Sequence, residues 1–408
     1  MKKMTTNDYI GREEKFGAHN YHPLPVVLER GEGVYVWDVE GKQYYDFLAA
    51  YSAVNQGHCH PKIVNALKVQ AEKLALTSRA FYNNVLGEWE EYITRLFGYD
   101  RVLPMNSGAE ADETALKLCR KWAYKVKGIP KNEAKIVVCD GNFHGRTITI
   151  ISMSSDPDAY NDYGPYTSGF VNIPYNDIEA LETALQDYNV AGFLVEPIQA
   201  EAGVYVPEDG YLKKAAELCK KYNVLFIADE VQTGLARTGK MLACDHENVR
   251  PDILVLGKAL SGGVFPVSCV LSNDEIMLTI KQGEHGSTYG GNPIAAKVSM
   301  AALNVIVDEK LVENAEKIGE LFRKEMRTIQ SDMIETVRGK GLLNAIAINP
   351  KAKYSAWQIC LQMKENGVIA KPTHEHIIRF TPPLIINEAQ MLDAIQRIKK
   401  SFGEMGLL

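Results

Sequence analysis

Two polar residues, an amine and an acid, stand at the ends of two strongly apolar segments. Lys258 follows the apolar run Ile253–Leu256 and precedes a glycine-rich turn. Asp229 ends a second apolar run, Val224–Ala228. Burial lowers the pKa of a lysine, so the neutral amine can attack a carbonyl carbon. Taken alone, Lys258 fits a Schiff-base lysine and a strand-end lysine that reaches solvent equally well.

The combination of Lys258 with Asp229 narrows the chemistry. In an open α/β sheet, ligands bind at the edge formed by the carboxyl ends of parallel strands. Pyridoxal phosphate (PLP) requires a lysine that holds its aldehyde as an imine and an acid that keeps its pyridine nitrogen protonated. The alternative for Asp229 is a helix N-cap after its strand. The two residues together predict a PLP site in which both are catalytic.

The segment Arg101–Ala111 offers a place for a phosphate group. It has the pattern of a short strand, a Ser-Gly turn and a helix from about Ala109 to Lys125. The first N–H groups of a helix have no partner within it and bind phosphate readily. Ser107 can cap this helix or bond a phosphate oxygen, and capping is the more common outcome for such a serine.

These segments carry a family resemblance that runs from about Phe16 to the C-terminus. The motifs that match are Asn106–Ala111, Phe143–Arg146, Glu196–Gln199, Asp229–Gly234 and Gly257–Gly263. In this order they resemble the class III PLP-dependent aminotransferases of fold type I. Two further strings, Gly17–Pro25 and Tyr51–Pro61, are similar to the ornithine aminotransferases within that class.

The resemblance implies an α/β protein of fold type I, with a mainly parallel seven-stranded sheet covered by helices. It also implies a smaller α+β domain built from both termini. The chain, at 408 residues, exceeds what one core usually supports. Its alternating strand and helix patterns predict a parallel sheet covered on both faces. The expected strands are 101–105, 135–139, 169–173, 191–196, 224–229, 252–256 and 267–271.

We expect three segments along the chain. Residues 1–51 form an N-terminal segment that joins the small domain, and residues 52–311 form the large PLP-binding domain. Residues 312–408 form the C-terminal small domain.

The resemblance also implies how the cofactor ring is held. Lys258 bonds the aldehyde and Asp229 pairs with the ring nitrogen. Val231, two residues further along the strand, packs on one ring face, and Phe143 stacks on the other. Gln232 bonds the phenolic oxygen. The alternative for Phe143 is an ordinary core aromatic.

The phosphate group is expected to be held by two subunits. The residues implied for this contact are Ser107, Gly108 and Ala109 of one subunit, and Ser287 and Thr288 of the other. The resemblance therefore implies a homodimer with shared active sites. From spacing alone, the segment around Ser287 is only a glycine-rich loop.

Carboxylate substrates require cations, and the planar guanidinium of arginine binds both carboxylate oxygens. The resemblance implies that Arg146, with Tyr21, holds the α-carboxylate of ornithine. Arg379 binds the α-carboxylate of glutamate and 2-oxoglutarate, Glu201 covers Arg379 in the first half-reaction, and Tyr51 lines the pocket. The alternative for Arg379 is a surface arginine on an edge strand.

The implied reaction transfers the δ-amino group of L-ornithine to 2-oxoglutarate through PLP. It yields L-glutamate and glutamate 5-semialdehyde, which cyclises to pyrroline-5-carboxylate. The alternatives are an N-acetylornithine or other ω-amino acid aminotransferase, an aminomutase of the same fold, and a catalytically silent binding protein. Tyr21 and Tyr51 favour ornithine, because the rival aminotransferases usually lack that pair.

Two local motifs suggest other chemistry. The segment Gly234–Met241 has the glycine spacing of a P-loop, but Met241 stands where magnesium binding requires Ser or Thr. His58, Cys59 and His60 suggest a metal site, but adjacent residues do not converge easily on one ion. No metal is expected.

Composition limits the partners and the compartment. A formal net charge of −6, with no basic run interleaved with aromatics, argues against nucleic acid. No apolar stretch is long enough for a membrane span. Seven scattered cysteines suit reduced thiols. The N-terminal segment lacks a secretory core and a convincing transit peptide. Eukaryotic members of the family are typically mitochondrial. The predicted location is the cytoplasm, and the alternative is a mitochondrial protein whose presequence has been removed.

Overall fold

The computed structural model describes residues 4–407. Its main element is a seven-stranded sheet of order β4-β10-β9-β8-β7-β5-β6. Only β10 runs antiparallel to its neighbours. The strands are β4 (Arg101–Met105), β5 (Lys135–Cys139), β6 (Phe170–Ile173), β7 (Val190–Val195), β8 (Leu225–Asp229), β9 (Ile253–Leu256) and β10 (Ser268–Ser272). The mainly parallel seven-stranded sheet is confirmed, and each strand lies within one residue of its expected bounds.

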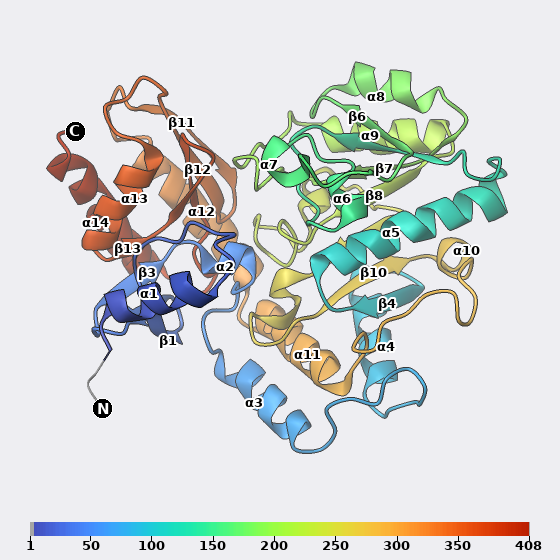
Figure 1. Ribbon diagram of the computed structural model, residues 1–408, viewed down its shortest axis with the longest axis horizontal. Helices are drawn as coiled ribbons and strands as arrows, with labels where there is room; N and C mark the ends of the chain where they lie inside the picture. The colour runs from blue at the N-terminus through green and yellow to red at the C-terminus, as the bar shows by residue number, and fades with distance from the viewer. Residues whose placement is uncertain (1–3, 408) are drawn as a thin grey trace.

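Helices cover both faces of this sheet because successive strand residues point to opposite sides. On one face, Ile136 and Val138 pack in the same core as α5 (Gly108–Trp122). On the other, Val137 and Cys139 share a core with α8 (Ile178–Leu185) and α9 (Tyr211–Lys221). Figure 1 shows α5 on one side of the strands and α8 and α9 on the other.

The remaining strands form two four-stranded sheets. Their orders are β1-β2-β3-β13 and β11-β12-β15-β14. The strands are β1 (Leu28–Glu32), β2 (Tyr35–Asp38), β3 (Gln43–Asp46), β11 (Ile334–Lys340), β12 (Leu343–Ile348), β13 (Val368–Ile369), β14 (Lys371–Thr373) and β15 (Ile377–Phe380). Because β13 pairs in parallel with β3, the two ends of the chain build one unit. Figure 1 shows the blue and red segments together on the left.

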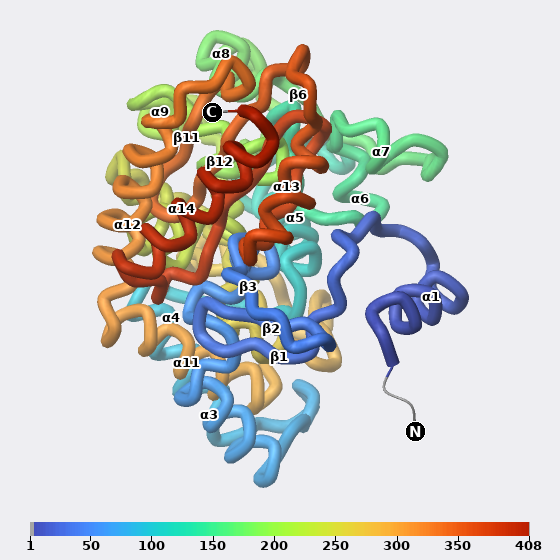
Figure 2. Tube along the Cα trace, turned by 90° about the vertical axis from the view of Figure 1, so that its left-hand side faces the viewer, coloured from blue at the N-terminus to red at the C-terminus, as the bar shows by residue number. Residues whose placement is uncertain are grey.

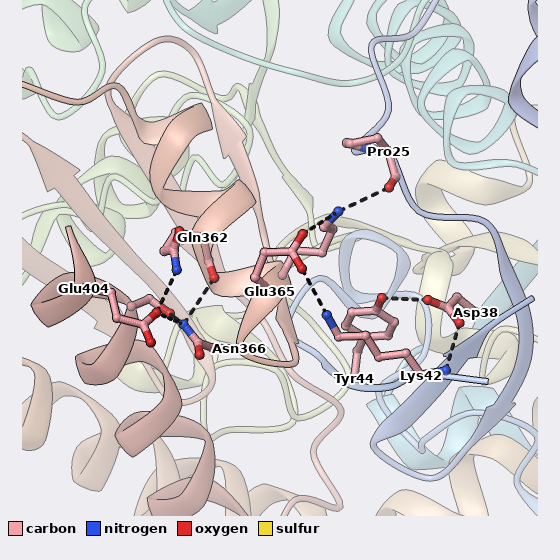
Figure 3. A network of polar contacts seen from close by, with 10 residues as sticks. Pro25, Asp38, Lys42, Tyr44, Gln362, Glu365, Asn366 and Glu404 are labelled. Atoms are coloured by element: carbon pink, nitrogen blue, oxygen red, sulfur yellow. Dashed lines mark hydrogen bonds and ion pairs between the residues drawn. The ribbon is translucent and has the colours of Figure 1, made fainter. Parts of the chain in front are cut away.

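Polar contacts reinforce the junction between the two ends of the chain (Figure 3). Lys42 Nζ lies 3.3 Å from Glu365 Oε2. Lys364 Nζ donates to the carbonyl oxygen of Pro25 at 3.4 Å. Next to Lys42, the Tyr44 hydroxyl donates to Asp38 at 2.7 Å. The two lysine contacts are exposed, and such contacts contribute little stability individually, so the shared sheet carries most of the connection.

The other helices link these sheets and extend the surface. They are α1 (Thr6–Phe16), α2 (Ala49–Ser52), α3 (Pro61–Ala71), α4 (Leu86–Phe97), α6 (Ile148–Ile151), α7 (Pro157–Tyr160), α10 (Asp274–Met277), α11 (Pro293–Asp308), α12 (Leu311–Met326), α13 (Ala356–Glu365) and α14 (Glu388–Glu404). In Figure 2, α1 stands apart from the rest of the chain, and none of its residues is buried. Within residues 4–407, no helix is long and apolar enough to cross a membrane.

The helix expected from about Ala109 to Lys125 differs in detail. The α-helix begins one residue earlier, at Gly108, and ends at Trp122. A π-helical turn, η1 (Ala123–Lys127), continues it. This turn closes because the N–H of Gly128, at a positive φ of 84°, bonds the carbonyl of Ala123.

Candidate active site

Strands β8 and β9 bring Asp229 and Lys258 to the same edge of the large sheet. Asp229 pairs in register with Val255 of β9, and Lys258 follows two residues after β9 ends. Lys258 begins a 3₁₀ turn, η3 (Lys258–Ser261), with a positive φ of 43°. Both side chains line a cavity of about 190 Å³. Burial lowers the pKa of the Lys258 ammonium, although the negative charge of Asp229 acts in the opposite direction.

The cavity gathers most of the residues predicted for the cofactor. Those that line it are Gly108, Ala109, Phe143, Asp229, Val231, Gln232 and Lys258. They come from α5, from the segment after β5 and from the segments that follow β8 and β9. Segments far apart in the sequence therefore meet here because the strands of the parallel sheet end at one edge.

Asp229 is held in place by two contacts. Its Oδ2 lies 2.6 Å from Nδ1 of His144, and its Oδ1 accepts a bond of 2.9 Å from the N–H of Val231. The second contact corrects the expectation that Val231 continues the strand. Strand β8 ends at Asp229, and the chain turns back so that Val231 contacts the same carboxylate.

Two further acids, Asp112 and Glu196, line the same cavity and were not assigned a role from the sequence. Burial raises the pKa of both carboxyls well above the usual range, and the negative charge of Asp229 adds to the shift. Several buried like charges cannot all ionise, so Asp112 and Glu196 favour their neutral forms.

A sequence signal for Asp112 existed but was weak. Asp112 lies on the buried face of α5 between Ala111 and Ala115, where an apolar residue would be expected. Its Oδ1 is buried and has no hydrogen-bond partner within the described part of the chain. An acid that interrupts an apolar helix face next to a phosphate-binding turn is the pattern that could have identified it.

The N-terminus of α5 opens into the cavity. Ser107 and Glu110 form a reciprocal cap, in which Ser107 Oγ accepts from the Glu110 N–H and Glu110 Oε2 accepts from the Ser107 N–H. The cap leaves the N–H groups of Gly108 and Ala109 free for an anion. Space at Gly108 is tight, because an added Cβ would lie 3.0 Å from Cγ1 of Val231 and would require that side chain to shift.

An ion pair lies close enough to Lys258 for both of its charges to act on the Lys258 pKa, although neither partner lines the cavity. Arg379 of β15 donates from Nη1 to Glu201 Oε2 at 2.7 Å and from Nη2 to Oε1 at 3.2 Å. The Arg379 side chain is 2% exposed, whereas that of Glu201 is 31% exposed. Because β15 lies between β12 and β14, Arg379 is not on an edge strand. Its guanidinium carbon lies 5.2 Å from the ring centroid of Tyr51.

Comparison with known proteins agrees with this geometry. The model of the aminotransferase class-III family matches residues 16–402. The chain belongs to the class-III aminotransferases. It is 65% identical to a mitochondrial ornithine aminotransferase of Drosophila melanogaster, across 97% of this chain and 91% of that protein.

Solved structures of related aminotransferases have the same fold as this class-III aminotransferase. An ornithine aminotransferase from Toxoplasma gondii superposes with a TM-score of 0.98 at 50% identity, covering 99% of this chain and 96% of that one. That structure has partial occupancy of PLP at its active site. An acetylornithine aminotransferase from Elizabethkingia anophelis has a TM-score of 0.90 at 62% identity, covering 98% and 100%. The recognised family and fold type are thereby confirmed.

PLP is the cofactor of class-III aminotransferases, and the residues of the cavity fit it. The buried carboxylate of Asp229 suits a cationic ring nitrogen, and the Lys258 amine suits an aldehyde. The free N–H groups at the start of α5 suit a phosphate. Gln232 Oε1 is buried without a hydrogen-bond partner among residues 4–407, which fits a polar group of the bound ring.

The turn that carries Tyr51 is left-handed. The φ angles of the four residues Ala49–Ser52 are 45°, 47°, 58° and 70°. Asp46 stabilises the start of this turn, since its Oδ1 accepts from the N–H groups of Leu48 and Ala49 at 2.8 and 2.9 Å. Non-glycine residues are strained in this conformation by roughly 1–2 kcal/mol each. Because the segment contains no glycine, its residue types do not indicate a left-handed turn.

Some predicted site residues lie outside the cavity of their own chain. Ser287 Oγ accepts from Asn106 Nδ2 at 2.9 Å, and Thr288 is exposed. Tyr21 is 71% exposed, and the exposed Arg146 lies over the ring of Phe143 with its guanidinium carbon 5.8 Å from the centroid. The single chain therefore assembles the cofactor end of the site more completely than the substrate end.

The two motifs that suggested metal binding and nucleotide binding, His58–His60 and Gly234–Met241, have other roles in the structure. His58 contacts Asp46 at 2.7 Å, whereas His60 contacts Glu309 at 3.1 Å, so these histidines point to different acids. The one group of metal-ligand type in the described chain is Asp112, His144 and Asp229, inside the cofactor cavity.

The P-loop-like segment Gly234–Met241 holds Arg237, which is fully buried. Arg237 donates to the carbonyl oxygens of Leu342 and Pro382. The segment thus connects the large sheet to the C-terminal part of the chain.

Proposed function

We propose that this class-III aminotransferase is an ornithine δ-aminotransferase. It moves the δ-amino group of L-ornithine to 2-oxoglutarate, with glutamate 5-semialdehyde and L-glutamate as products. The semialdehyde cyclises to pyrroline-5-carboxylate. The observation that carries the proposal is the bidentate Glu201–Arg379 pair, whose charges act on Lys258. The names and high identity of the Drosophila and Toxoplasma relatives support it.

The chemistry divides between the cofactor and the chain. Bound PLP supplies an electron sink that stabilises negative charge on the substrate carbon. Lys258 Nζ takes the proton from that carbon and returns it elsewhere, which requires an amine of lowered pKa. Asp229, fixed by His144 and the Val231 N–H, keeps a positive charge at the ring nitrogen. Neutral Asp112 and Glu196 do not compete for that charge.

The Glu201–Arg379 ion pair selects which amine of ornithine reacts. While Glu201 covers Arg379, this buried cation cannot attract the α-carboxylate of ornithine. That carboxylate is then left to Arg146 and Tyr21 at the exposed side, and the distal amine reaches Lys258. In the second half-reaction the ion pair opens, so the α-carboxylate of 2-oxoglutarate can bind Arg379 bidentately.

A donor comparison tests this function. The purified protein with PLP is mixed with ornithine, N-acetylornithine or 4-aminobutyrate, and kcat/KM is measured for each donor with 2-oxoglutarate. Ornithine should be the best donor and should change the visible absorbance of the cofactor. A preference for N-acetylornithine would support the activity named for the Elizabethkingia relative instead. Turnover without a separate keto acid would indicate an aminomutase.

We also propose a homodimer with shared active sites, in which Ser287 and Thr288 complete the phosphate site of the partner subunit. The first support is that Ser287 and Thr288 do not line the cavity of their own chain. The second is that α1 buries no residue against its own chain, which leaves its surface available to a partner subunit. Mixing Lys258→Ala subunits with Thr288→Ala subunits tests it. Each homodimer would be impaired, and the mixed dimer would regain one intact site. No recovery would contradict a shared site.

The division into residues 1–51, 52–311 and 312–408 is also a proposal. Its first boundary falls before the last residue of α2 and its second after the first residue of α12, and the β3–β13 pairing joins the first and third segments. Limited proteolysis should cut preferentially near these boundaries. The cytoplasmic location is proposed from the sequence alone, against the mitochondrial name of the Drosophila relative, and cell fractionation tests it.

A further inference from the structure

A second cation, Lys371, faces the Glu201–Arg379 pair. Lys371 of β14 stands directly opposite Arg379 of β15 in the antiparallel register, so the two side chains lie on the same face of the sheet. Thr373, two residues along β14, shares that face, and its Oγ1 donates to the backbone oxygen of Glu201 at 2.6 Å. The face that carries Lys371 is therefore the face on which the Glu201 segment packs.

The charges of this cluster do not balance. Glu201 gives both carboxylate oxygens to Arg379. Throughout residues 4–407, no carboxylate oxygen lies within 4.0 Å of Lys371 Nζ, which instead lies 5.8 Å from the ring centroid of Tyr21. Two cations thus share one anion, and cations directly opposite on neighbouring strands repel each other.

The environment of Lys371 reflects this imbalance. Burial lowers the pKa of the Lys371 ammonium, the charge of Arg379 lowers it further, and the charge of Glu201 raises it. A half-buried ammonium without its own ion-pair partner is costly. A carboxylate that came to Lys371 would remove that cost.

We propose that Lys371 is a positioning residue for the second half-reaction, receiving the Glu201 carboxylate when a keto-acid carboxylate takes its place on Arg379. This inference rests on the proposed function. Glu201 is the mobile partner, since its side chain is far more exposed than that of Arg379. After the exchange, two carboxylates face two cations. Without Lys371, the displaced Glu201 would remain next to the incoming carboxylate and repel it.

Loss of Lys371 should affect the two half-reactions differently. Ornithine reacts while Glu201 stays on Arg379, so Lys371 should not matter there. The keto acid reacts only after Glu201 has moved, so the loss of Lys371 should weaken its binding. The limiting rate should change little, because Lys371 does not touch the reacting atoms.

The test uses the full-length holoenzyme and single-turnover absorbance measurements of each half-reaction. Lys371→Met should raise the KM for 2-oxoglutarate about 10-fold, with the limiting rate and the ornithine half-reaction unchanged. Lys371→Arg keeps the charge and should restore binding. The control is Lys351→Met, at an exposed lysine in a turn, which should change neither half-reaction. Thermal unfolding of the holoenzymes verifies that each variant is folded.

A double variant decides whether Lys371 acts through Glu201. In the Glu201→Ala background there is no carboxylate to receive, so adding Lys371→Met should have no further effect on the KM for 2-oxoglutarate. A full effect in that background, or an equal loss in the ornithine half-reaction, would mean that Lys371 binds substrate directly and would overturn the proposal.

The Lys371 test stays separate from the test of ornithine activity. If the wild-type protein does not accept ornithine, the proposed function fails. The half-reactions with glutamate and 2-oxoglutarate would still measure the Lys371 effect, because both substrates bring an α-carboxylate to Arg379.

Discussion

The Lys258 cavity and the ion pair near it are built differently, and we call them the inner end and the outer end of the site. At the inner end, Asp229 is buried and held by both the His144 ring and the Val231 N–H. At the outer end, one ion pair joins the buried Arg379 to the partly exposed Glu201. The inner end serves the same cofactor in both half-reactions, whereas the outer end must accept two substrates in succession. A redundant set of contacts suits the first task, and a single exchangeable contact suits the second.

Burial explains why these ends respond differently to change. Removing one partner of a fully buried ion pair leaves an uncompensated charge, which costs about 3–5 kcal/mol. At the inner end nothing in the reaction replaces a lost contact. At the outer end, the proposed mechanism has an incoming substrate carboxylate replace Glu201 on Arg379, so opening the pair need not leave a bare charge. The difference predicts that inner-end variants lose activity generally, whereas outer-end variants change substrate choice.

The largest effect is expected at the inner end, from Asp229→Asn. Without the carboxylate, the ring nitrogen loses its charged partner, and the rate of the ornithine half-reaction should fall about 10³-fold. The control is Asp112→Asn. Burial already favours the neutral form of Asp112, and asparagine resembles that form, so this variant should retain most of the activity. Equal losses in single-turnover measurements would mean that Asp112 shares the charged role.

At the outer end, Glu201→Ala should change the preferred donor. The uncovered Arg379 would bind α-carboxylates of ordinary amino acids, so kcat/KM for glutamate should rise and that for ornithine should fall, each about 10-fold. Glu208→Ala is the control, since Glu208 is an exposed acid of the same segment. Donor preference that stays the same in Glu201→Ala would show that the ion pair does not select the amine.

The pH dependence of cofactor attachment sharpens the comparison further. Burial lowers the pKa of Lys258, so its amine becomes neutral at a lower pH than an ordinary lysine with a pKa near 10.5. In the cofactor-free protein, the rate of PLP attachment should rise with pH with a midpoint below pH 10.5. Asp229→Asn removes the charge that raises this pKa, so the midpoint should move to still lower pH. A midpoint at or above 10.5 would contradict a buried amine.

The inner end was largely predictable from the sequence. Buried parallel strands are continuous apolar runs, so a lysine or an aspartate at the end of such a run stands out, as Lys258 and Asp229 do. The phosphate turn around Ser107 was recognisable by its pattern of a short strand, a Ser-Gly turn and a helix. Asp112 was harder to recognise, because only the folded structure shows that its helix face meets the cavity.

The outer end depends on contacts between segments that are distant in the sequence, which local sequence patterns do not predict. The role proposed for Lys371 rests on the register in which β14 pairs with β15, which sets Lys371 opposite Arg379, and on the distant Glu201 segment that packs on that face. The expected role of Ser287 depends on a second subunit. A left-handed turn at Ala49–Ser52 lacks the glycines that usually mark positive φ.

The left-handed turn gives the smallest expected effect, on stability instead of activity. Ala50 is exposed and has a φ of 47°, a conformation that glycine adopts without strain. Ala50→Gly should therefore raise the free energy of unfolding by about 1 kcal/mol, as measured by chemical denaturation. Ala66→Gly is the matched control, because Ala66 lies in the regular helix α3, where glycine should lower stability by about 1 kcal/mol. Opposite signs would show that the outer end stores strain next to Tyr51, whereas equal destabilisation would mean that the turn costs nothing to hold.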